Sequence, residues 1–360
     1  MIRLRSFWFQ LHKWLGVTLA ILIIPLSLSG SALVWHDWLD EQVHPQRFAA
    51  SGAATLPPSV YVAKALTLAE PGERVSALSF PAGNGSVQAT LTKAAKGVGR
   101  PSRAMVWLDP ATAAPIERGG SRDGILGTLH VLHGSLMVPG VGRKIVGWIG
   151  VAMLLSSLTG IWLWWPLKGS FTHGLRWSRR PDFNSNLHHT GGFWIAVPLA
   201  ILSATGVWIS FPSVFNPAAR APSGPTQPLS APAQSPDEAL AAAQLRVPGE
   251  VASMSWPTER TADWIISVRG DGTPVEVTVK DSDGTASIPL ARPETFARTM
   301  RRIHDGTGMP LVWQIIIFLG GVLPAGLAVT GVLMWLRMRR RRGKHRRGAA
   351  AMAEAEALAN

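Results

Sequence analysis

Four histidines carry the chemistry that this sequence could perform. They are His12, His133, His188 and His304, and each stands beside a long apolar segment. An ionisable side chain at the end of such a segment is costly and is a functional candidate by default. The chain contains no cysteine, so neither a disulfide nor a thiolate metal site can form. Imidazole nitrogen is therefore the leading ligand for any cofactor that the chain binds.

Four uncharged runs of at least 22 residues accompany these histidines. Each is long enough to cross a hydrocarbon core, which needs about 20 helical residues. With 47% hydrophobic residues and 16 Trp, the composition is typical of a membrane protein. The first run also resembles a signal peptide, but the core of a signal peptide has typically only about 7–15 residues. We predict four transmembrane helices within residues 1–36, 144–168, 191–215 and 309–336.

The net charge of +13 is distributed unevenly along the chain. The segments before the first run, between the second and third runs, and after the fourth hold 15 of the 35 Lys and Arg against three acidic residues. The two long loops hold the other 20 basic residues and 19 acidic ones, so they are almost neutral. The positive-inside rule then predicts that both termini and loop 169–190 are cytoplasmic, and that loops 37–143 and 216–308 lie outside. The basic tail 337–360 is expected to lie near anionic membrane lipid, and we expect no nucleic-acid partner.

The histidines belong to a pattern that the chain repeats, which indicates an α-helical bundle made of two internal repeats. Glycines follow His12 at offsets of 4 and 18 residues, and glycines follow His188 at the same two offsets. The glycine of a Thr-Gly pair follows both His133 and His304 after 27 residues, and a tryptophan follows each after 31 residues. We expect the repeated glycines to allow close contact between helices.

The long loops repeat as well. Residues 62–81 read VAKALTLAEPGERVSALSFP, and residues 238–257 read EALAAAQLRVPGEVASMSWP. Both segments predict a short apolar helix, a Pro-Gly turn and a strand of alternating residues, and further alternating strands follow each. We therefore predict two small α+β domains outside the membrane. Segment 221–236 is rich in Pro and Ser and is expected to be an unfolded linker.

The placement of the four histidines predicts two sites. His12 and His188 precede segments that run outward, so both should lie near the cytoplasmic face, whereas His133 and His304 precede segments that run inward from the outer face. Two histidines on neighbouring helices at each face could supply two axial nitrogens to one iron. We therefore predict two bis-histidine haem sites in a four-helix bundle, one in each leaflet. A hydrocarbon core of about 30 Å is long for one electron hop, and a cofactor at each face divides the path.

A different metal site at the outer face stays open as an alternative. His130 and His133 are three residues apart and would share a helix face. Together with His36 or His44 they could bind zinc or copper. His130 has no counterpart in the repeat, because Arg301 stands at the matching position.

A second histidine follows His188 directly. Successive helix positions are about 100° apart, so His188 and His189 cannot both face one porphyrin as axial ligands. The repeat places Lys13 opposite His189, which leaves His189 outside the repeated set. We expect His189 to point toward the headgroups or the basic inner loop.

Three sequence stretches carry a family resemblance. They are LHKWLGVTLAILIIPLSLSGSALVW, LHGSLMVPG with TGIWLWW, and IHDGTG with TGVLMWL, separated by loops with the order helix, Pro-Gly turn and strand. Over nearly the whole chain the sequence resembles the PepSY-associated transmembrane proteins. These are bacterial inner-membrane proteins, often encoded with iron uptake, and some act as haem-containing reductases of ferric siderophores. The resemblance implies that the family's motif histidines fall on the four histidines above, that two haem b groups are bound, and that the outer loops are PepSY-like domains.

The resemblance also implies a function, namely transmembrane electron transfer to a periplasmic acceptor such as a ferric siderophore. No residue need act as acid, base or nucleophile, because the protein holds, spaces and tunes its cofactors. The sequence has no Gly-rich dinucleotide fingerprint, so a cytoplasmic partner or quinol is the expected electron donor. The alternative is a non-redox, membrane-anchored binding or signalling protein whose PepSY-like domains act on periplasmic peptides or other partners.

Overall fold

A computed structural model describes most of the chain. The described residues are 2–49, 52–83, 85–94, 102–120, 123–165, 172, 182–215, 227–270, 273–290 and 294–359. The chain divides into two compact units. The membrane unit consists of Met1–His36, Thr128–Arg220 and Glu294–Asn360, and the sheet unit consists of Asp37–Gly127 and Ala221–Pro293.

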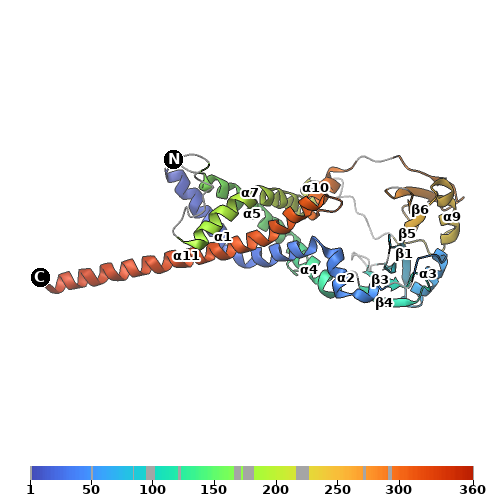
Figure 1. Cartoon of the computed structure of the whole chain (residues 1–360), viewed down its shortest axis with the longest axis horizontal. Coiled ribbons are helices and arrows are strands. Elements are labelled where there is room, and N and C mark those ends of the chain that lie inside the picture. Colours follow the sequence, from blue (N-terminus) through green and yellow to red (C-terminus); the bar gives the residue numbers. More distant parts are fainter. Residues whose placement is uncertain are drawn as a thin grey trace. The chain divides into compact units, whose positions relative to one another are not determined.

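Four long helices build the membrane unit (Figure 1). They are α1 (Ile2–Leu33), α5 (Gly142–Trp164), α7 (Phe183–Ser210) and α11 (Leu311–Ala359). Each contains a segment long and apolar enough to cross a membrane, which confirms the prediction of a helical membrane protein. Helix α1 packs against α5 and α11, and α7 packs against the same two helices, so the four close into a bundle.

The long helices extend beyond the uncharged runs, as α7 and α11 show. Helix α7 begins at Phe183 because the Asp182 side chain caps it and accepts a hydrogen bond from the Ser185 backbone N–H at 3.1 Å. His188 therefore lies inside α7, rather than ahead of it. Helix α11 continues as a single helix through the basic segment, which Figure 1 shows as the extension toward the C-terminus. Arg, Lys and Ala are good helix formers, which accounts for this continuation.

Short helices carry the other two site histidines. Helix α4 (Gly124–Ser135) precedes α5 and carries His133, and α10 (Phe296–Asp305) precedes α11 and carries His304. Gly306 ends α10 with a φ of 80°, a left-handed conformation that glycine adopts without steric cost. Further short helices are α2 (His36–Val43), η1 (Pro45–Arg47) and α8 (Pro212–Phe215).

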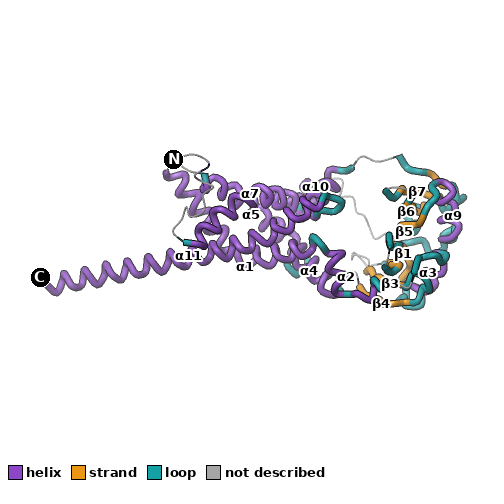
Figure 2. The backbone as a smooth tube through the Cα atoms, viewed as in Figure 1, coloured by secondary structure: helices purple, strands orange, loops and turns teal. Residues whose placement is uncertain are grey.

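The sheet unit is built on one antiparallel sheet of eight strands, drawn in orange in Figure 2. The first long loop supplies β1 (Glu73–Ser79), β2 (Val87–Lys93), β3 (Ser102–Leu108) and β4 (Pro115–Gly120), and the second supplies β5 (Glu250–Ser255), β6 (Asp263–Arg269), β7 (Val275–Lys280) and β8 (Ala286–Ser287). The strand order is β4-β3-β2-β1-β5-β6-β7-β8. Each loop therefore forms a meander of four strands, and the meanders join through their first strands.

This joint sheet corrects the prediction of two separate outer domains. Strand β1 pairs antiparallel with β5, and Leu78 stands opposite Met254 at the middle of the pairing. Both side chains are fully buried. An unpaired first strand would expose a row of backbone N–H and C=O groups, and pairing the two meanders removes both of these edges. The sheet unit consequently has one hydrophobic core to which both loops contribute.

Two helices complete that core. Helix α3 (Pro58–Leu66) packs on β1, β2 and β3, and α9 (Pro236–Arg246) packs on β6, β7 and β8. The two helices also contact each other, since the Asp237 carboxylate accepts hydrogen bonds from the backbone N–H and the hydroxyl of Ser59. Trp264 is fully buried, and its indole N–H donates to Asp281 at 3.0 Å.

The predicted linker is ordered in its described part. The Asp281 carboxylate accepts hydrogen bonds from the backbone N–H groups of Ala233 and Gln234. Ser235 then starts α9 with a capping box that it forms with Glu238. The expectation of an unfolded linker is therefore wrong for residues 227–236, and residues 221–226 lie outside the described part of the chain.

Candidate functional site

The four histidines lie in two pairs. The rings of His12 and His188 have their centres 6.3 Å apart at an interplanar angle of 85°. The rings of His133 and His304 have their centres 6.1 Å apart at an angle of 39°. Each pair takes one histidine from each half of the chain. These are the pairings predicted from the face at which each histidine precedes its apolar segment.

The two pairs lie toward opposite ends of the bundle. His12 is on α1, and the ring of His133 lies against Gly30, which is 18 residues farther along the same helix. That separation corresponds to about 27 Å of helix at 1.5 Å per residue. The two pairs are therefore separated by most of the thickness of a hydrocarbon core.

Each histidine is held by a Ser-Gly or Thr-Gly dipeptide of a neighbouring helix. The Nδ1 atom of His12 lies 3.0 Å from the Thr159 hydroxyl oxygen, and that of His188 lies 3.0 Å from the Thr330 hydroxyl oxygen. The Nδ1 atom of His304 lies 3.0 Å from the Thr205 hydroxyl oxygen.

The fourth histidine uses a backbone acceptor in place of the hydroxyl. The Nδ1 atom of His133 lies 2.9 Å from the carbonyl oxygen of Leu26, one turn before Gly30 on α1. The hydroxyl of Ser29 donates to the same carbonyl oxygen at 3.0 Å. Ser29 therefore takes the position before glycine that threonine takes in the other dipeptides. Its hydroxyl contacts His133 only indirectly, because both groups bond the Leu26 carbonyl oxygen.

These bonds fix which imidazole nitrogen carries the proton. The hydroxyls of Thr159, Thr330 and Thr205 each donate to backbone carbonyls one turn earlier in their own helices. Each hydroxyl oxygen is thus left to accept, so the histidine Nδ1 must donate to it. His133 donates to a carbonyl oxygen, which can only accept. In all four rings Nε2 consequently keeps its lone pair, and this is the nitrogen that can bind a metal.

The glycine of each dipeptide makes room for the ring. A Cβ atom on Gly30 would lie 2.5 Å from Cε1 of His133, and one on Gly206 would lie 3.1 Å from Cε1 of His304. At Gly160 and Gly331 the corresponding distance, to His12 and His188, is 3.4 Å. At Gly30 and Gly206 the close contact that the repeated glycines allow is therefore contact with the imidazole ring of a neighbouring helix.

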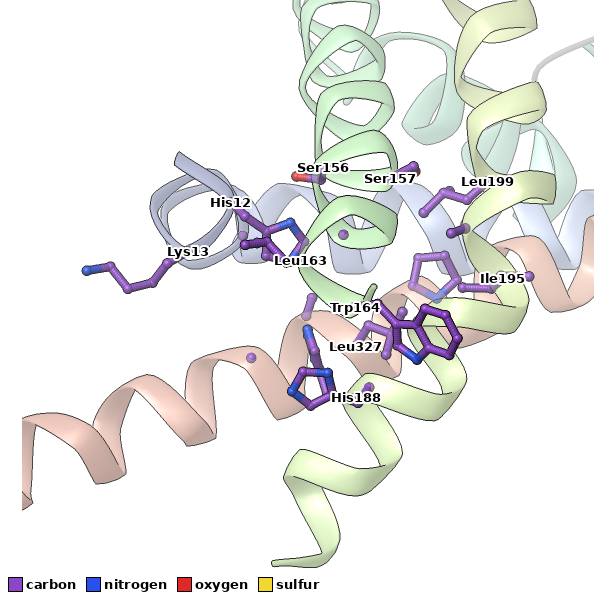
Figure 3. Close-up of a pocket in the computed structure, with 18 of the residues that line it drawn as sticks. His12, Lys13, Ser156, Ser157, Leu163, Trp164, His188, Ile195, Leu199 and Leu327 are labelled. Atoms are coloured by element: carbon purple, nitrogen blue, oxygen red, sulfur yellow. The ribbon is translucent and has the colours of Figure 1, made fainter. Parts of the chain in front are cut away.

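A cavity adjoins the pair formed by His12 and His188. It has a volume of about 230 Å³, is lined mainly by apolar side chains of α1, α5, α7 and α11, and both imidazoles face it (Figure 3). Gly16 and Gly192 also line it, and a Cβ on Gly16 would meet nothing within 4 Å. These two glycines, which the repeat singles out, leave space at the histidine pair.

The rings of His133 and His304 are half-buried. Burial lowers the pKa of His304 to about 4 and also lowers the pKa of His133. Both rings are therefore neutral at pH 7, which is the form that offers a nitrogen lone pair to a metal. Both pairs share imidazoles with Nδ1 bonded and Nε2 available.

The other histidines whose side chains the structure describes occupy three different environments. His36 and His130 have ring centres 6.3 Å apart, whereas the Nδ1 atom of His44 donates to the Asp40 carboxylate at 2.8 Å. His189 lines the same cavity as His188, although the sequence places it toward the headgroups. Among the described residues no group of three or more His, Asp or Glu could hold one metal ion. The alternative of a zinc or copper site built from three histidines is therefore not found in that part of the chain.

The fold and the histidines define a membrane protein with four apolar helices in the described part of the chain and a pair of imidazoles toward each end of the bundle. The chain belongs to the PepSY-associated transmembrane family, because the model for the PepSY-associated TM region matches residues 9–338. The resemblance that the motifs indicate is thereby confirmed. Comparison of the sequence with curated proteins gives no match.

Proposed function

We propose that the protein carries electrons across the bacterial inner membrane through two b-type haems and reduces a ferric siderophore on the periplasmic side. The observation that supports this proposal most is that the four imidazoles form two pairs. In each pair the rings are spaced for one metal ion between them, and their Nδ1 bonds leave Nε2 available. The ligands would be His12 with His188 and His133 with His304.

The spacing fits a metal with two axial imidazoles. Two rings that bind one metal ion in line, with metal–nitrogen bonds of about 2 Å, have their centres roughly 6 Å apart. The observed ring separations of 6.3 and 6.1 Å match this value. The hydroxyl and carbonyl partners at Nδ1 are the outer-shell groups that orient such ligands and raise their basicity.

The surroundings fit a flat apolar cofactor. The cavity between the helices at His12 and His188 is mainly apolar, and glycines are among the residues that line it next to the two imidazoles. At the other pair Gly30 and Gly206 give the imidazoles access to the space between the helices. When bound, haem supplies an iron that alternates between the ferric and ferrous states.

The work of the chain is to hold and space these sites. The Thr-Gly and Ser-Gly dipeptides orient the ligands, and the bundle separates the two pairs along the membrane normal. No side chain needs to give or take a proton for this transfer. Reduction releases iron from a siderophore because ferrous iron binds hard oxygen ligands less strongly, and it stands low in the affinity order of divalent metals.

We infer the orientation from charge. The basic segments adjoin the end of the bundle that carries His12 and His188, so this end and both termini would be cytoplasmic. Electrons would then enter at His12 and His188 from a cytoplasmic partner or from quinol. They would leave near His133 and His304 to the periplasmic acceptor.

The alternative is a membrane-anchored binding or signalling protein. The eight-stranded sheet with α3 and α9 could bind periplasmic peptides or partners, with the helices serving only as an anchor. That alternative assigns no task to four imidazoles, each bonded at Nδ1 and grouped into two pairs. We therefore favour electron transfer.

Transmembrane reduction tests the proposal. The purified holoprotein is placed in vesicles that enclose ferric hydroxamate or ferric catecholate siderophores together with a ferrous-iron indicator, and dithionite is added outside as a membrane-impermeant reductant. We expect ferrous iron to form inside much faster than in protein-free vesicles. His188→Ala should return the rate to that of protein-free vesicles, whereas His44→Gln should keep the wild-type rate. Full reduction of both haems without any ferrous iron would refute the siderophore as acceptor.

A further inference from the structure

A third histidine pair lies beside the pair formed by His133 and His304. The ring centres of His36 and His130 are 6.3 Å apart at an angle of 78°. This separation equals that of His12 and His188. His36 begins α2 and His130 lies on α4, so the two come from separate helices, and both belong to the membrane unit.

The packing of the fold does not require this pair. The second repeat lacks both histidines. His36 lies six residues after Gly30, and the matching position after Gly206 is Pro212. His130 lies three residues before His133, and the matching position before His304 is Arg301. The second half of the chain thus forms its short helices α8 and α10 with neither imidazole. A role in chemistry explains the pair better than a role in packing.

The surroundings of the pair decide which ligand suits it. His36 and His130 are both exposed, whereas the four site histidines are at least half-buried. A haem is large and apolar and needs burial, but a metal ion can complete its coordination with water. Among the described residues no third His, Asp or Glu joins the two imidazoles, so water would fill the remaining positions.

We propose that His36 and His130 bind one divalent first-row transition-metal ion. Imidazole suits iron, nickel, copper and zinc as a ligand. His130 is one turn of α4 away from His133, a rise of about 4.5 Å along the helix. If the proposed function holds, the ion is ferrous iron that is released near His133 and His304. Only this choice of metal rests on the proposed function. The metal site itself does not depend on the haems.

Metal titration of the full-length protein tests the site. The probe is Ni²⁺, which is stable in air and which, among these ions, binds such ligands more tightly than all but copper. Binding is measured by calorimetry at neutral pH on protein purified without a histidine tag. We expect one ion per chain. Loss of a group that only hydrogen-bonds a metal ligand typically costs about 10–100-fold in metal affinity. His36 and His130 would bind the metal directly, so His36→Ala and His130→Ala should each weaken binding at least about tenfold. The double variant should bind little more weakly than either single variant, since one ion needs both ligands.

Control variants separate a chelating pair from independent surface histidines. His44→Gln and His189→Gln should keep the wild-type affinity, and the thermal unfolding temperature should show that all variants are folded. Additive losses in the double variant, or unchanged affinity in either single variant, would overturn the proposal. Loss of haem absorbance in His36→Ala or His130→Ala would also overturn it, because the pair would then hold haem. Absence of all haem with intact Ni²⁺ binding would instead refute only the proposed electron transfer.

Discussion

The four histidines show what a sequence can reveal about single residues and what it cannot. Their spacing from glycine and tryptophan identifies His12, His133, His188 and His304, and the face at which each precedes its apolar segment predicts how they pair. The partners at Nδ1 were not predicted, although the Thr-Gly dipeptides are part of the same pattern. The reason is physical, because these bonds join neighbouring helices, and spacing along one helix does not define the rotation of another helix against it.

The tightest contact in the site leads to a prediction about Gly30. A Cβ at this position would lie 2.5 Å from Cε1 of His133, so in Gly30→Ala the ring must move. Overpacking of this kind costs about 1–3 kcal/mol. We expect Gly30→Ala to lower the occupancy or change the midpoint potential of the haem proposed at His133 and His304, measured by redox titration of the absorption spectrum. The haem proposed at the other pair should be unchanged.

Gly134→Ala is the matched control for this substitution. Gly134 follows His133 on α4, and a Cβ there would meet nothing within 4 Å. Its haem spectrum and potentials should equal those of the wild type. Equal effects of Gly30→Ala and Gly134→Ala would show that the ring contact does not position His133.

At the scale of elements, the existence of the helices follows from the sequence but their ends do not. Uncharged runs predict all four long helices. Helix α7 begins before the uncharged run because Asp182 caps its N-terminus ahead of several polar residues. Helix α11 continues past the uncharged run because its basic residues are good helix formers. A hydropathy pattern reports how well a segment dissolves in lipid, whereas caps and propensities decide where the helix ends.

The closest packing of two long helices gives a prediction at this scale. A Cβ on Gly321 of α11 would meet the hydroxyl of Ser31 and the carbonyl oxygen of Ser27 on α1. The Ser31 hydroxyl also donates to the Phe318 carbonyl oxygen at 2.7 Å, so these helices cannot separate without losing this bond. We expect Gly321→Ala to destabilise the protein by about 1–3 kcal/mol, measured as a lower thermal unfolding temperature in detergent.

Gly326 offers the comparison within the same helix. A Cβ at Gly326 would meet nothing within 4 Å, and alanine is favoured over glycine in a helix by about 1 kcal/mol. Gly326→Ala should therefore leave the unfolding temperature unchanged or raise it. A loss of stability in Gly326→Ala as large as that in Gly321→Ala would argue against the close contact of α1 with α11.

At the scale of the whole molecule, the sequence predicts the parts better than their assembly. The helices α3 and α9 and the strands that follow each of them are predicted by the alternation and by the Pro-Gly turns. Their union into one sheet does not, because pairing of β1 with β5 joins residues such as Leu78 and Met254 that are far apart in the chain. Single-sequence patterns report local geometry, and edge pairing depends on which backbone groups would otherwise stay unpaired.

Cysteine labelling tests the orientation of the whole chain. Ala82 and Ser282 are exposed in the sheet unit, and Ser6 is exposed on α1 near the N-terminus. Because the chain has no cysteine of its own, Ala82→Cys and Ser282→Cys should label with an impermeant thiol reagent in intact spheroplasts. Ser6→Cys should label only after lysis. The reverse pattern would place the long loops in the cytoplasm and contradict the charge argument.

Haem content is the most direct measurement of the central claim. Protein purified from cells supplied with haem precursor is assayed by pyridine haemochrome and by its reduced-minus-oxidised spectrum. We predict two low-spin b-type haems per chain, with His12→Ala and His188→Ala each losing one and the same haem, and His133→Ala and His304→Ala each losing the other, since each pair shares one iron. A wild-type protein that is folded and contains no haem would contradict the account.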